Sequence, residues 1–374
     1  MEKDNGTMRE LDRLKTKAIV MVLALGILAM SGCTSQQHSP PPTPSASPPA
    51  IEVIASGLEI PWSLDFLPDG SIIFTERPGR IRLIDAKGNL LSAPLLEIGE
   101  VAHRGEGGLL GIVLHPDFPN NGFVYVYYTY GVGQVLRNKV VRYTSKNLTL
   151  TDATVIIDGI PAASVHDGGR IKFGPDGRLY VTTGDASQAS LAQDIDSLAG
   201  KILRLNYDGT VPSDNPFPGS PVYSYGHRNP EGLAWDGQGR LWATEHGAAA
   251  RDEVNLIRPG QNYGWPEIQG DESAPGMQRP VIHSGNVTWA PSGAAFQANS
   301  LYFAGLRSES LWEIVVEGDS VTLRRHLQGE FGRLRTVVVG PDNALYITTS
   351  NWDGRGSPTA DDDRIIRVNL GGLQ

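Results

Sequence analysis

Two short segments of the chain carry the residue types that proton transfer needs. His166 opens the run His166-Asp-Gly-Gly-Arg170 before one expected strand, and Asp185 follows the next expected strand. If these strands pair, the end of one lies near the start of the other, and the carboxylate can orient the imidazole. A histidine oriented in this way is a competent general base. Taken singly, each residue is more often an ordinary turn residue, so only the pair predicts chemistry.

Arginines offer a second kind of chemistry, the binding of anionic groups. Arg228 and Asn229 lie in the run Tyr225-Gly-His-Arg-Asn-Pro-Glu-Gly232 and could hold anionic or carbonyl groups of a ligand. An isolated arginine there would more often bind a loop carbonyl. Arg333 and Arg335 are two residues apart on an expected strand and therefore project from one face. Two such cations need an anion or two carboxylates; otherwise they point to solvent.

Oxygen ligands gather in two neighbouring segments. Residues 245–253 are followed by Asn262-Tyr-Gly-Trp-Pro266, and together they offer the hard oxygen ligands that Ca²⁺ prefers. The first segment lacks the alternating aspartates of an EF-hand loop, so its spacing alone is a weak metal signal. Cys33 is the only cysteine, so no intramolecular disulfide can form. Stability outside the cell would have to come from packing or metal.

These residues must be positioned by β-structure. Six segments repeat one form, an apolar strand, a turn rich in Pro, Asp, Asn or Gly and a second strand, at residues 66–75, 114–128, 173–183, 235–244, 295–303 and 339–348. Pro presets the first corner of a turn, while Asp and Gly supply side-chain hydrogen bonds and positive φ. The repeats predict an all-β fold, a six-bladed β-propeller of four-stranded antiparallel blades. A β-sandwich with chance turn matches is the alternative, which four shared Pro-Asp pairs disfavour.

The two ends of the repeat region are expected to close the ring. Residues 51–54 would pair with the last blade, which ends at residues 364–370. The spacing of the repeats is irregular because long loops at 208–222 and 258–285 interrupt them. Such loops are where functional residues are expected.

The chain before the repeats has a different composition. A basic stretch precedes the apolar residues 18–30 and then Cys33, an order that resembles a bacterial lipoprotein signal. We therefore expect residues 1–33 to be a signal segment, 34–50 a Pro/Ser-rich linker and 51–374 the catalytic propeller. The protein would be exported to the cell envelope and would contact a membrane only through a lipid on Cys33. A buried cysteine after a cleaved signal, or an uncleaved anchor, is the alternative.

The charge balance excludes one class of partner. Lys and Arg total 32 against 41 Asp and Glu, which gives a formal net charge of −9. A nucleic-acid binder needs a basic surface to neutralise phosphates, so no nucleic-acid partner is expected. Propellers include binders, lactonases and oxidoreductases, so the fold alone does not decide the function.

Taken together, the motifs resemble those of one enzyme family. In order along residues 51–370 they are Gly-x-Gly-Gly-Leu-Leu-Gly, His-Pro-Asp-Phe, His-x-Gly-Gly-Arg, Thr-Thr-Gly-Asp, Gly-His-Arg-Asn-Pro-x-Gly, Glu-His-Gly and Asn-Tyr-Gly-Trp-Pro. This set resembles the soluble aldose sugar dehydrogenases of the glucose/sorbosone dehydrogenase family, which use pyrroloquinoline quinone (PQQ). The resemblance implies a six-bladed propeller that binds PQQ and Ca²⁺ and oxidises the C1 hydroxyl of aldose sugars to lactones. Electrons would pass to an external acceptor, whose identity the resemblance leaves open.

The resemblance also implies a role for each site residue. His166 would take the proton from the sugar, Asp185 would orient it, and Arg228 would stabilise charge developing on the quinone. The residues matched to the surroundings of PQQ are Glu106, Arg228, Asn229, Thr288, Arg307, Arg333 and Arg335. The backbone carbonyls of Gly247 and Ala248 match ligands of the Ca²⁺ that polarises PQQ. Glu253 and Tyr263 match a second, structural Ca²⁺ site.

Three residues depart from the family pattern. Ala248 replaces the usual Pro, but only its carbonyl is required. Arg307 replaces Lys and keeps the charge. Glu106 replaces a Gln that contacts PQQ, and a carboxylate near an anionic cofactor is unfavourable unless it is protonated, turned away or paired with Ca²⁺.

Two rival functions remain open at this point. A Ca²⁺-dependent lactonase of the same fold would use a metal-polarised carbonyl and water, but it gives no reason for clustered arginines. A sugar-binding propeller that has lost catalysis is opposed by the presence of His166, Asp185 and Arg228 together. No role is assigned to His246.

Overall fold

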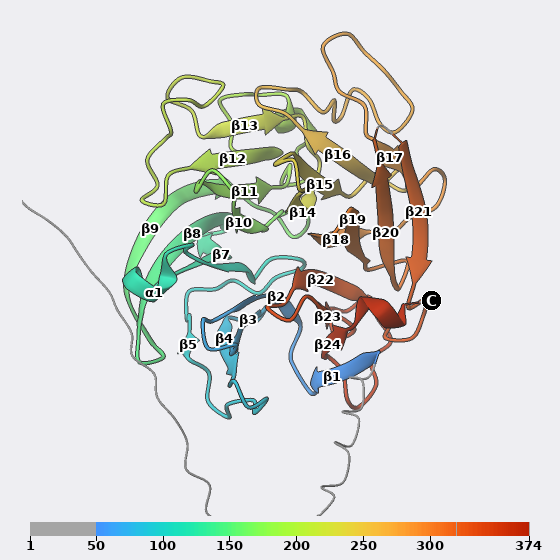
Figure 1. The fold of residues 1–374 in the computed structure, drawn as a ribbon. Helices are drawn as coiled ribbons and strands as arrows, with labels where there is room; N and C mark the ends of the chain where they lie inside the picture. Colours follow the sequence, from blue (N-terminus) through green and yellow to red (C-terminus); the bar gives the residue numbers. More distant parts are fainter. Residues whose placement is uncertain (1–49, 319, 374) are drawn as a thin grey trace, which may run out of the picture. The chain divides into compact units, whose positions relative to one another are not determined.

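The computed structural model describes residues 50–318 and 320–373. The expected signal segment, Cys33 and nearly all of the expected linker lie outside this range. Within it, the strands form six four-stranded antiparallel sheets arranged around a central axis (Figure 1). This confirms the predicted six-bladed β-propeller. No helix in the described part of the chain is long and apolar enough to cross a membrane.

Each blade is a meander that starts at the central channel. The first blade contains β2 (Pro61–Phe66), β3 (Ile72–Glu76), β4 (Arg80–Ile84) and β5 (Leu96–Glu97). The second contains β6 (Leu109–Leu114), β7 (Phe123–Val132), β8 (Val135–Lys146) and β9 (Thr149–Pro161). The third contains β10 (Ile171–Phe173), β11 (Leu179–Thr183), β12 (Lys201–Leu205) and β13 (Val222–Tyr225).

The remaining blades follow the same plan. The fourth contains β14 (Pro230–Trp235), β15 (Leu241–Glu245), β16 (Glu253–Ile257) and β17 (Ile282–His283). The fifth contains β18 (Pro291–Gln297), β19 (Ser300–Gly305), β20 (Ser310–Glu317) and β21 (Ser320–His326). The sixth contains β22 (Leu334–Val339), β23 (Leu345–Thr349), β24 (Ile365–Val368) and β1 (Ile51–Ala55). Short helical turns are α1 (Phe118–Asn121), η1 (Ala189–Ala192) and η2 (Leu370–Gly372).

The sixth blade closes the ring with strands from both ends of the described chain. β1 pairs antiparallel with β24, and Ile51 lies opposite Val368. This confirms the predicted pairing of residues 51–54 with the last blade. A closed ring leaves no long unpaired sheet edge between the first and last blades.

The repeated turn joins the first two strands of each blade, and one aspartate contact explains why the sequence repeats there. In four blades an aspartate side chain accepts a hydrogen bond from the backbone N–H two residues later; these are Asp69, Asp176, Asp236 and Asp342. Such contacts stabilise a tight turn locally. In the second blade the corresponding residues form α1 instead, and the amide oxygen of Asn121 accepts from Phe123 N–H at 2.9 Å.

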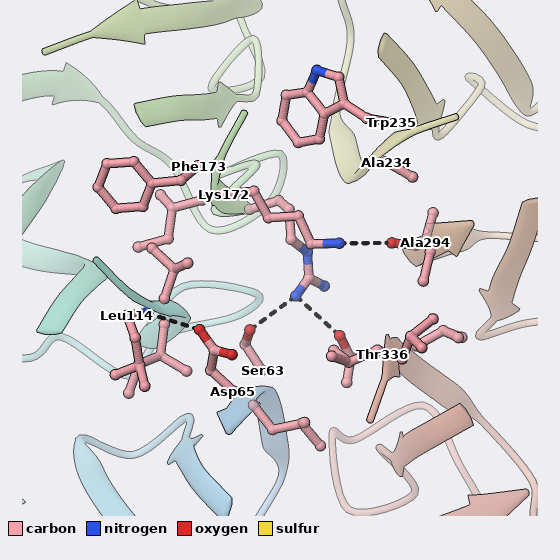
Figure 2. Close-up of a pocket in the computed structure, with 18 of the residues that line it drawn as sticks. Ser63, Asp65, Leu114, Lys172, Phe173, Ala234, Trp235, Ala294 and Thr336 are labelled. Atoms are coloured by element: carbon pink, nitrogen blue, oxygen red, sulfur yellow. Dashed lines mark hydrogen bonds between the residues drawn. The ribbon is translucent and has the colours of Figure 1, made fainter. Parts of the chain in front are cut away.

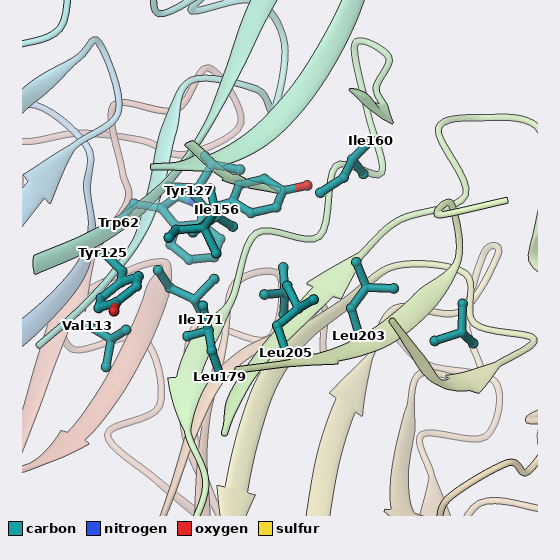
Figure 3. Close-up of a cluster of buried hydrophobic side chains, with 14 residues drawn as sticks. Trp62, Val113, Tyr125, Tyr127, Ile156, Ile160, Ile171, Leu179, Leu203 and Leu205 are labelled. Atoms are coloured by element: carbon teal, nitrogen blue, oxygen red, sulfur yellow. The ribbon is translucent and has the colours of Figure 1, made fainter. Parts of the chain in front are cut away.

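The hydrophobic core lies between neighbouring blades. One cluster, shown in Figure 3, packs Tyr125 and Tyr127 of β7 against Ile171 of β10 and Leu203 of β12. All four side chains are buried. Because the blades are locked face to face, the loops that precede their innermost strands are held in fixed positions around one end of the channel.

Candidate active site

One end of the central channel holds two adjoining cavities of about 370 and 480 Å³. They share Glu106, His246 and Arg307 among their lining residues. The first is also lined by His166, Arg228, Asn229, Gly247, Ala248, Ala249, Asp252 and Thr288. The second is also lined by Glu231, Ala290, Leu306, Glu309, Arg333, Arg335 and Arg355. The structure therefore gathers most of the sequence-predicted site residues at one end of the ring.

His166 and Asp185 form the contact that the pairing of β10 with β11 makes feasible. The Nδ1 atom of His166 lies 2.7 Å from Oδ1 of Asp185. His166 has a positive φ of 65°, an uncommon backbone conformation for a non-glycine residue. A Cβ at Gly184 would lie 1.9 Å from the carbonyl oxygen of His166, so only glycine fits beside this loop. With Nδ1 donating to Asp185, Nε2 is the ring atom left to accept a proton.

Asp185 is held by two further donors. Its Oδ2 atom accepts a hydrogen bond from Nε1 of Trp265 at 2.8 Å, and its Oδ1 atom accepts from Ser187 N–H at 2.8 Å. The Asp185 side chain is 2% exposed, against 17% for His166. The carboxylate is thus fixed while the imidazole borders the cavity. Trp265 belongs to the run 262–266, whose residue types suggest oxygen ligands for a metal and give no sign of this indole donor.

Arg228 is a half-buried cation that forms no ion pair with a carboxylate among the described residues. Its Nη1 atom donates to the carbonyl of His246 at 3.4 Å, and its Nε atom is buried without a hydrogen-bond partner among the described residues. Its guanidinium lies 5.3 Å from the centroid of the Trp265 ring. Burial lowers the pKa of Arg228. Such a group is arranged to receive an anionic or carbonyl oxygen from a ligand.

The side chains of Asn229 and Thr288 form hydrogen bonds with other residues of the protein at the edge of the cavity. Asn229 accepts from Gly168 N–H at 2.9 Å, which ties it to the loop that carries His166. Thr288 donates through Oγ1 to Oδ2 of Asp252 at 2.8 Å. Asp252 also accepts from the backbone N–H groups of Gly247, Trp289 and Ala290. Sequence reasoning missed this organising role, although Asp252 lies inside the acidic run 245–253.

Arg333 and Arg335 are buried and paired with carboxylates, so they do not point to solvent. Arg333, just before β22, contacts Asp353 at 2.9 Å, and Arg335 contacts Glu231 at 3.0 Å. Arg335 also lies 3.5 Å from Asp353. Two neighbouring cations need an anion or two carboxylates, and the structure provides two carboxylates. These arginines therefore line the second cavity with much of their charge already balanced.

Glu106 is neutralised by a cation that sequence reasoning did not find. Its Oε1 atom lies 2.5 Å from Nη1 of Arg355, and its Oε2 atom accepts from His166 N–H at 2.9 Å. Burial and the charge of Glu231 raise the pKa of Glu106, but these two contacts outweigh them and hold it below its usual range. Glu106 is thus an ionised, paired carboxylate that braces the His166 loop. No sequence signal links it to Arg355.

His246 lies where the two cavities meet. Its Nε2 atom is 3.5 Å from Oε1 of Glu231, a distance that makes an ion pair but not a hydrogen bond. Burial lowers the pKa of His246, yet the charge of Glu231 reverses this and raises it. Glu231 thus favours the protonated form of His246 at the junction of the two cavities.

The two expected metal sites differ in how well the residues suit a cation. Gly247 and Ala248 lie on a loop that borders the first cavity. Glu253 is buried, and burial followed by the charge of Glu245 raises its pKa to about 7. The Tyr263 hydroxyl already donates to Leu256 O and accepts from Arg258 N–H, so only its carbonyl would be available. The described residues contain no group of three His, Cys, Asp or Glu side chains that could hold a metal.

Comparisons with known proteins agree with this architecture. Residues 58–366 match the family model described as Glucose / Sorbosone dehydrogenase. The chain is 34% identical to aldose sugar dehydrogenase YliI of Escherichia coli, over 81% of this chain and 91% of that protein. The PQQ-bound aldose sugar dehydrogenase of Streptomyces coelicolor superposes with a TM-score of 0.81 at 43% identity, covering 86% of this chain and 99% of that one.

A second solved structure is equally similar. A protein of Thermus thermophilus, described as a putative oxidoreductase (glucose dehydrogenase), has a TM-score of 0.81 at 48% identity, over 85% of this chain and 99% of that one. The matched region contains every candidate site residue named above. The comparisons confirm the resemblance drawn from the motifs: the chain belongs to the glucose/sorbosone dehydrogenase family.

Proposed function

We propose that this protein is a PQQ- and Ca²⁺-dependent dehydrogenase that oxidises the C1 hydroxyl of aldoses to lactones and passes electrons to an external acceptor. The observation that carries the proposal is the His166–Asp185 contact of 2.7 Å beside the unpaired guanidinium of Arg228. Family membership and the PQQ-bound relative from Streptomyces coelicolor support it.

The residues around the first cavity suit an anionic cofactor. Arg228 and Arg307 both border it, and neither forms an ion pair with a carboxylate among the described residues. The buried, unpartnered Nε atom of Arg228 lacks an acceptor that a ligand oxygen would supply. PQQ carries three carboxylates, and guanidinium groups bind carboxylates well. The carboxylates of the same cavity are already engaged, Glu106 by Arg355 and Asp252 by backbone N–H groups, so the two guanidinium groups are the charges left for a ligand.

The chain's own residues would perform the proton chemistry. His166 would accept the C1 hydroxyl proton at Nε2, while Asp185 keeps Nδ1 protonated and stabilises the imidazolium that forms. Arg228 would stabilise negative charge that develops opposite the base. Bound PQQ would supply the hydride acceptor, polarised by Ca²⁺ on the carbonyls of Gly247 and Ala248.

Reconstitution separates this proposal from its rivals. The apoprotein would be loaded with PQQ and Ca²⁺ and mixed with several aldoses, and dye reduction would be followed. A dehydrogenase reduces the dye, whereas a lactonase hydrolyses added lactone without PQQ, and a sugar-binding propeller does neither. Absence of dye reduction with every aldose, despite bound PQQ, would refute the proposal.

Trp265 is expected to act through Asp185. Trp265→Phe removes the Nε1–H donor but keeps an aromatic ring beside Arg228. Because a hydrogen bond to a charged group contributes about 1.5–3 kcal/mol, we expect kcat to fall by about 10-fold or more. KM for the sugar should change little, which steady-state kinetics can measure. Trp312→Phe, on an outer strand, is the matched control and should leave kcat unchanged; an equal effect of both substitutions would contradict the assignment.

Ca²⁺ is expected to stabilise the fold through Glu253. A buried carboxylate whose pKa is raised to about 7 gains from a bound cation. Adding Ca²⁺ at about 100 times its Kd should raise the unfolding free energy by about 2.7 kcal/mol. Glu253→Gln keeps the shape but should lose most of this gain in denaturant titrations. Glu272→Gln, at an exposed ion pair with Arg251, should respond like the unaltered protein.

We also propose that residues 1–33 are a lipoprotein signal, that residues 34–50 form a linker to a propeller comprising residues 51–374, and that Cys33 carries the lipid. The order of basic, apolar and small residues before Cys33 supports this. The Cys33→Ser variant should be absent from the membrane fraction of cells that produce it. Retention of that variant in the membrane fraction would contradict lipid anchoring through Cys33.

A further inference from the structure

The opposite end of the central channel holds a separate cavity of about 460 Å³ (Figure 2). Residues from all six innermost strands line it, and none of them lines the two cavities at the other end. Its wall is mostly apolar and includes Val113, Leu114, Phe173, Trp235, Phe296 and Val339. Its ionisable lining residues are Asp65, Arg170 and Lys172. A concave, largely apolar cavity with a few convergent polar groups is typical of a small-molecule site.

Arg170 forms the floor between this cavity and the candidate active site. Its Nη1 atom donates to the hydroxyls of Ser63 and Thr336, each at 3.0 Å, and its Nε atom donates to Glu231 O at 2.8 Å. Its guanidinium also lies 4.2 Å from the Trp62 ring centroid. This one side chain thereby connects four blades across the channel. The cavity beneath it, called the lower cavity from here on, is therefore separate from the candidate active site.

The positive charge in this cavity is not balanced by a direct ion pair. Lys172 donates to the carbonyl of Ala294 at 3.1 Å, a neutral acceptor, as Figure 2 shows. The three acceptors of Arg170 are also neutral, and its Nη2 atom is buried without a partner among the described residues. Neither cation lies within 4.0 Å of a carboxylate in the described part of the chain. Burying cations without an anionic partner is costly.

Asp65 is not an anionic partner for Lys172 or Arg170. Its two oxygens accept the backbone N–H groups of Phe66 and Leu114, each at 2.8 Å. Burial followed by the charge of Arg170 lowers the pKa of Lys172 to about 8, despite the opposing effect of Asp65. Lys172 therefore has ammonium protons that face a cavity and lack an acceptor suited to their charge.

We propose that the lower cavity binds a small organic monocarboxylate with an apolar body, whose carboxylate contacts the Lys172 ammonium. The apolar body would lie against Leu114, Phe173 and Trp235. A sugar or a polyphosphate suits the cavity less well, because the lining offers few polar donors and only one half-buried ammonium. The proposal does not depend on sugar oxidation.

Isothermal titration of the full chain with benzoate tests the proposal, with benzyl alcohol as the neutral probe of similar shape. We expect benzoate to bind at one site and benzyl alcohol to bind at least about tenfold more weakly, since a charge-assisted hydrogen bond is lost. Lys172→Met should weaken benzoate binding by about tenfold or more, whereas Asp65→Asn should keep or strengthen it. Lys146→Met, at an exposed position of β8, should have no effect.

Two further measurements keep the result decisive. Arg307→Gln, at the opposite cavity, should leave benzoate affinity unchanged, and crystals with 4-bromobenzoate should place bromine beside Trp235. If Lys172→Met fails to fold, Lys172→Gln replaces it in the same titration. The proposal is overturned if neither benzoate nor hexanoate, a second monocarboxylate with an apolar body, binds the folded protein. It is also overturned if benzoate binding depends on Arg307 and not on Lys172, or if bromine appears only in the two cavities of the candidate active site.

Discussion

His166→Ala should lower kcat of the PQQ- and Ca²⁺-loaded protein by about 10²–10⁴-fold, the range that a general base contributes. The loss follows from the geometry, because Nδ1 is committed to Asp185 and only Nε2 can accept the hydroxyl proton. Binding of PQQ and Ca²⁺ should persist, since the lining arginines and the loop of Gly247 remain. Steady-state dye reduction over a range of sugar concentrations measures kcat and KM separately.

His326→Gln provides the matched control for this result. His326 lies on β21, an outer strand of the fifth blade, and contacts Glu313 at 2.9 Å. His326 and Glu313 form a histidine–carboxylate pair like that of His166 and Asp185, but this pair lies outside the cavity. Its substitution should leave kcat within about twofold. Full activity of folded His166→Ala protein would exclude His166 as the base.

Arg228→Met should reduce kcat/KM by about 10²–10³-fold, a loss comparable to removing one preorganised charge-stabilising donor. The side-chain volume is largely kept, but the first cavity loses the Arg228 guanidinium, whose buried Nε atom has no hydrogen-bond partner among the described residues. PQQ affinity should fall as well, by about tenfold or more. Fluorescence titration with PQQ gives the affinity, and dye reduction gives the rate.

Arg324→Met is the control for charge removal as such. Arg324 lies on β21 with 58% of its side chain exposed, so its loss alters net charge without touching the cavity. An exposed substitution of this kind is expected to be nearly neutral. If Arg228→Met and Arg324→Met bind PQQ equally well, the assignment of Arg228 to the cofactor is wrong.

The parts of the fold that sequence could predict are those with a local cause. The turn aspartates contact N–H groups two residues away, so their signature repeats wherever a blade begins. The His166–Asp185 contact joins neighbouring strands of one hairpin, and strand pairing alone suggests it. Ring closure by β1 was predictable because a propeller must pair its terminal strands.

The parts that could not be predicted depend on which blades face each other across the channel. Glu106 meets Arg355, and Glu231 meets Arg335, from segments with no shared period in the sequence. For this reason the sequence alone could not decide whether the arginine pair meets carboxylates, an anion or solvent. The role of Trp265 could not be predicted for a different reason. The sequence does not distinguish a tryptophan that donates a hydrogen bond from any other aromatic residue in a loop, and only the structure places Asp185 beside it.

The seam between β1 and β24 also bears on how the molecule reaches its native state. Ile51 and its partner Val368 lie near opposite ends of the described chain, so the sixth blade cannot be completed until almost all of that chain is available. Contacts of such sequence separation slow folding. A chain cut before β24 would keep β1 as an unpaired strand. For the same reason, opening the ring at an exposed loop and joining the ends at this seam should yield a permuted protein that still folds.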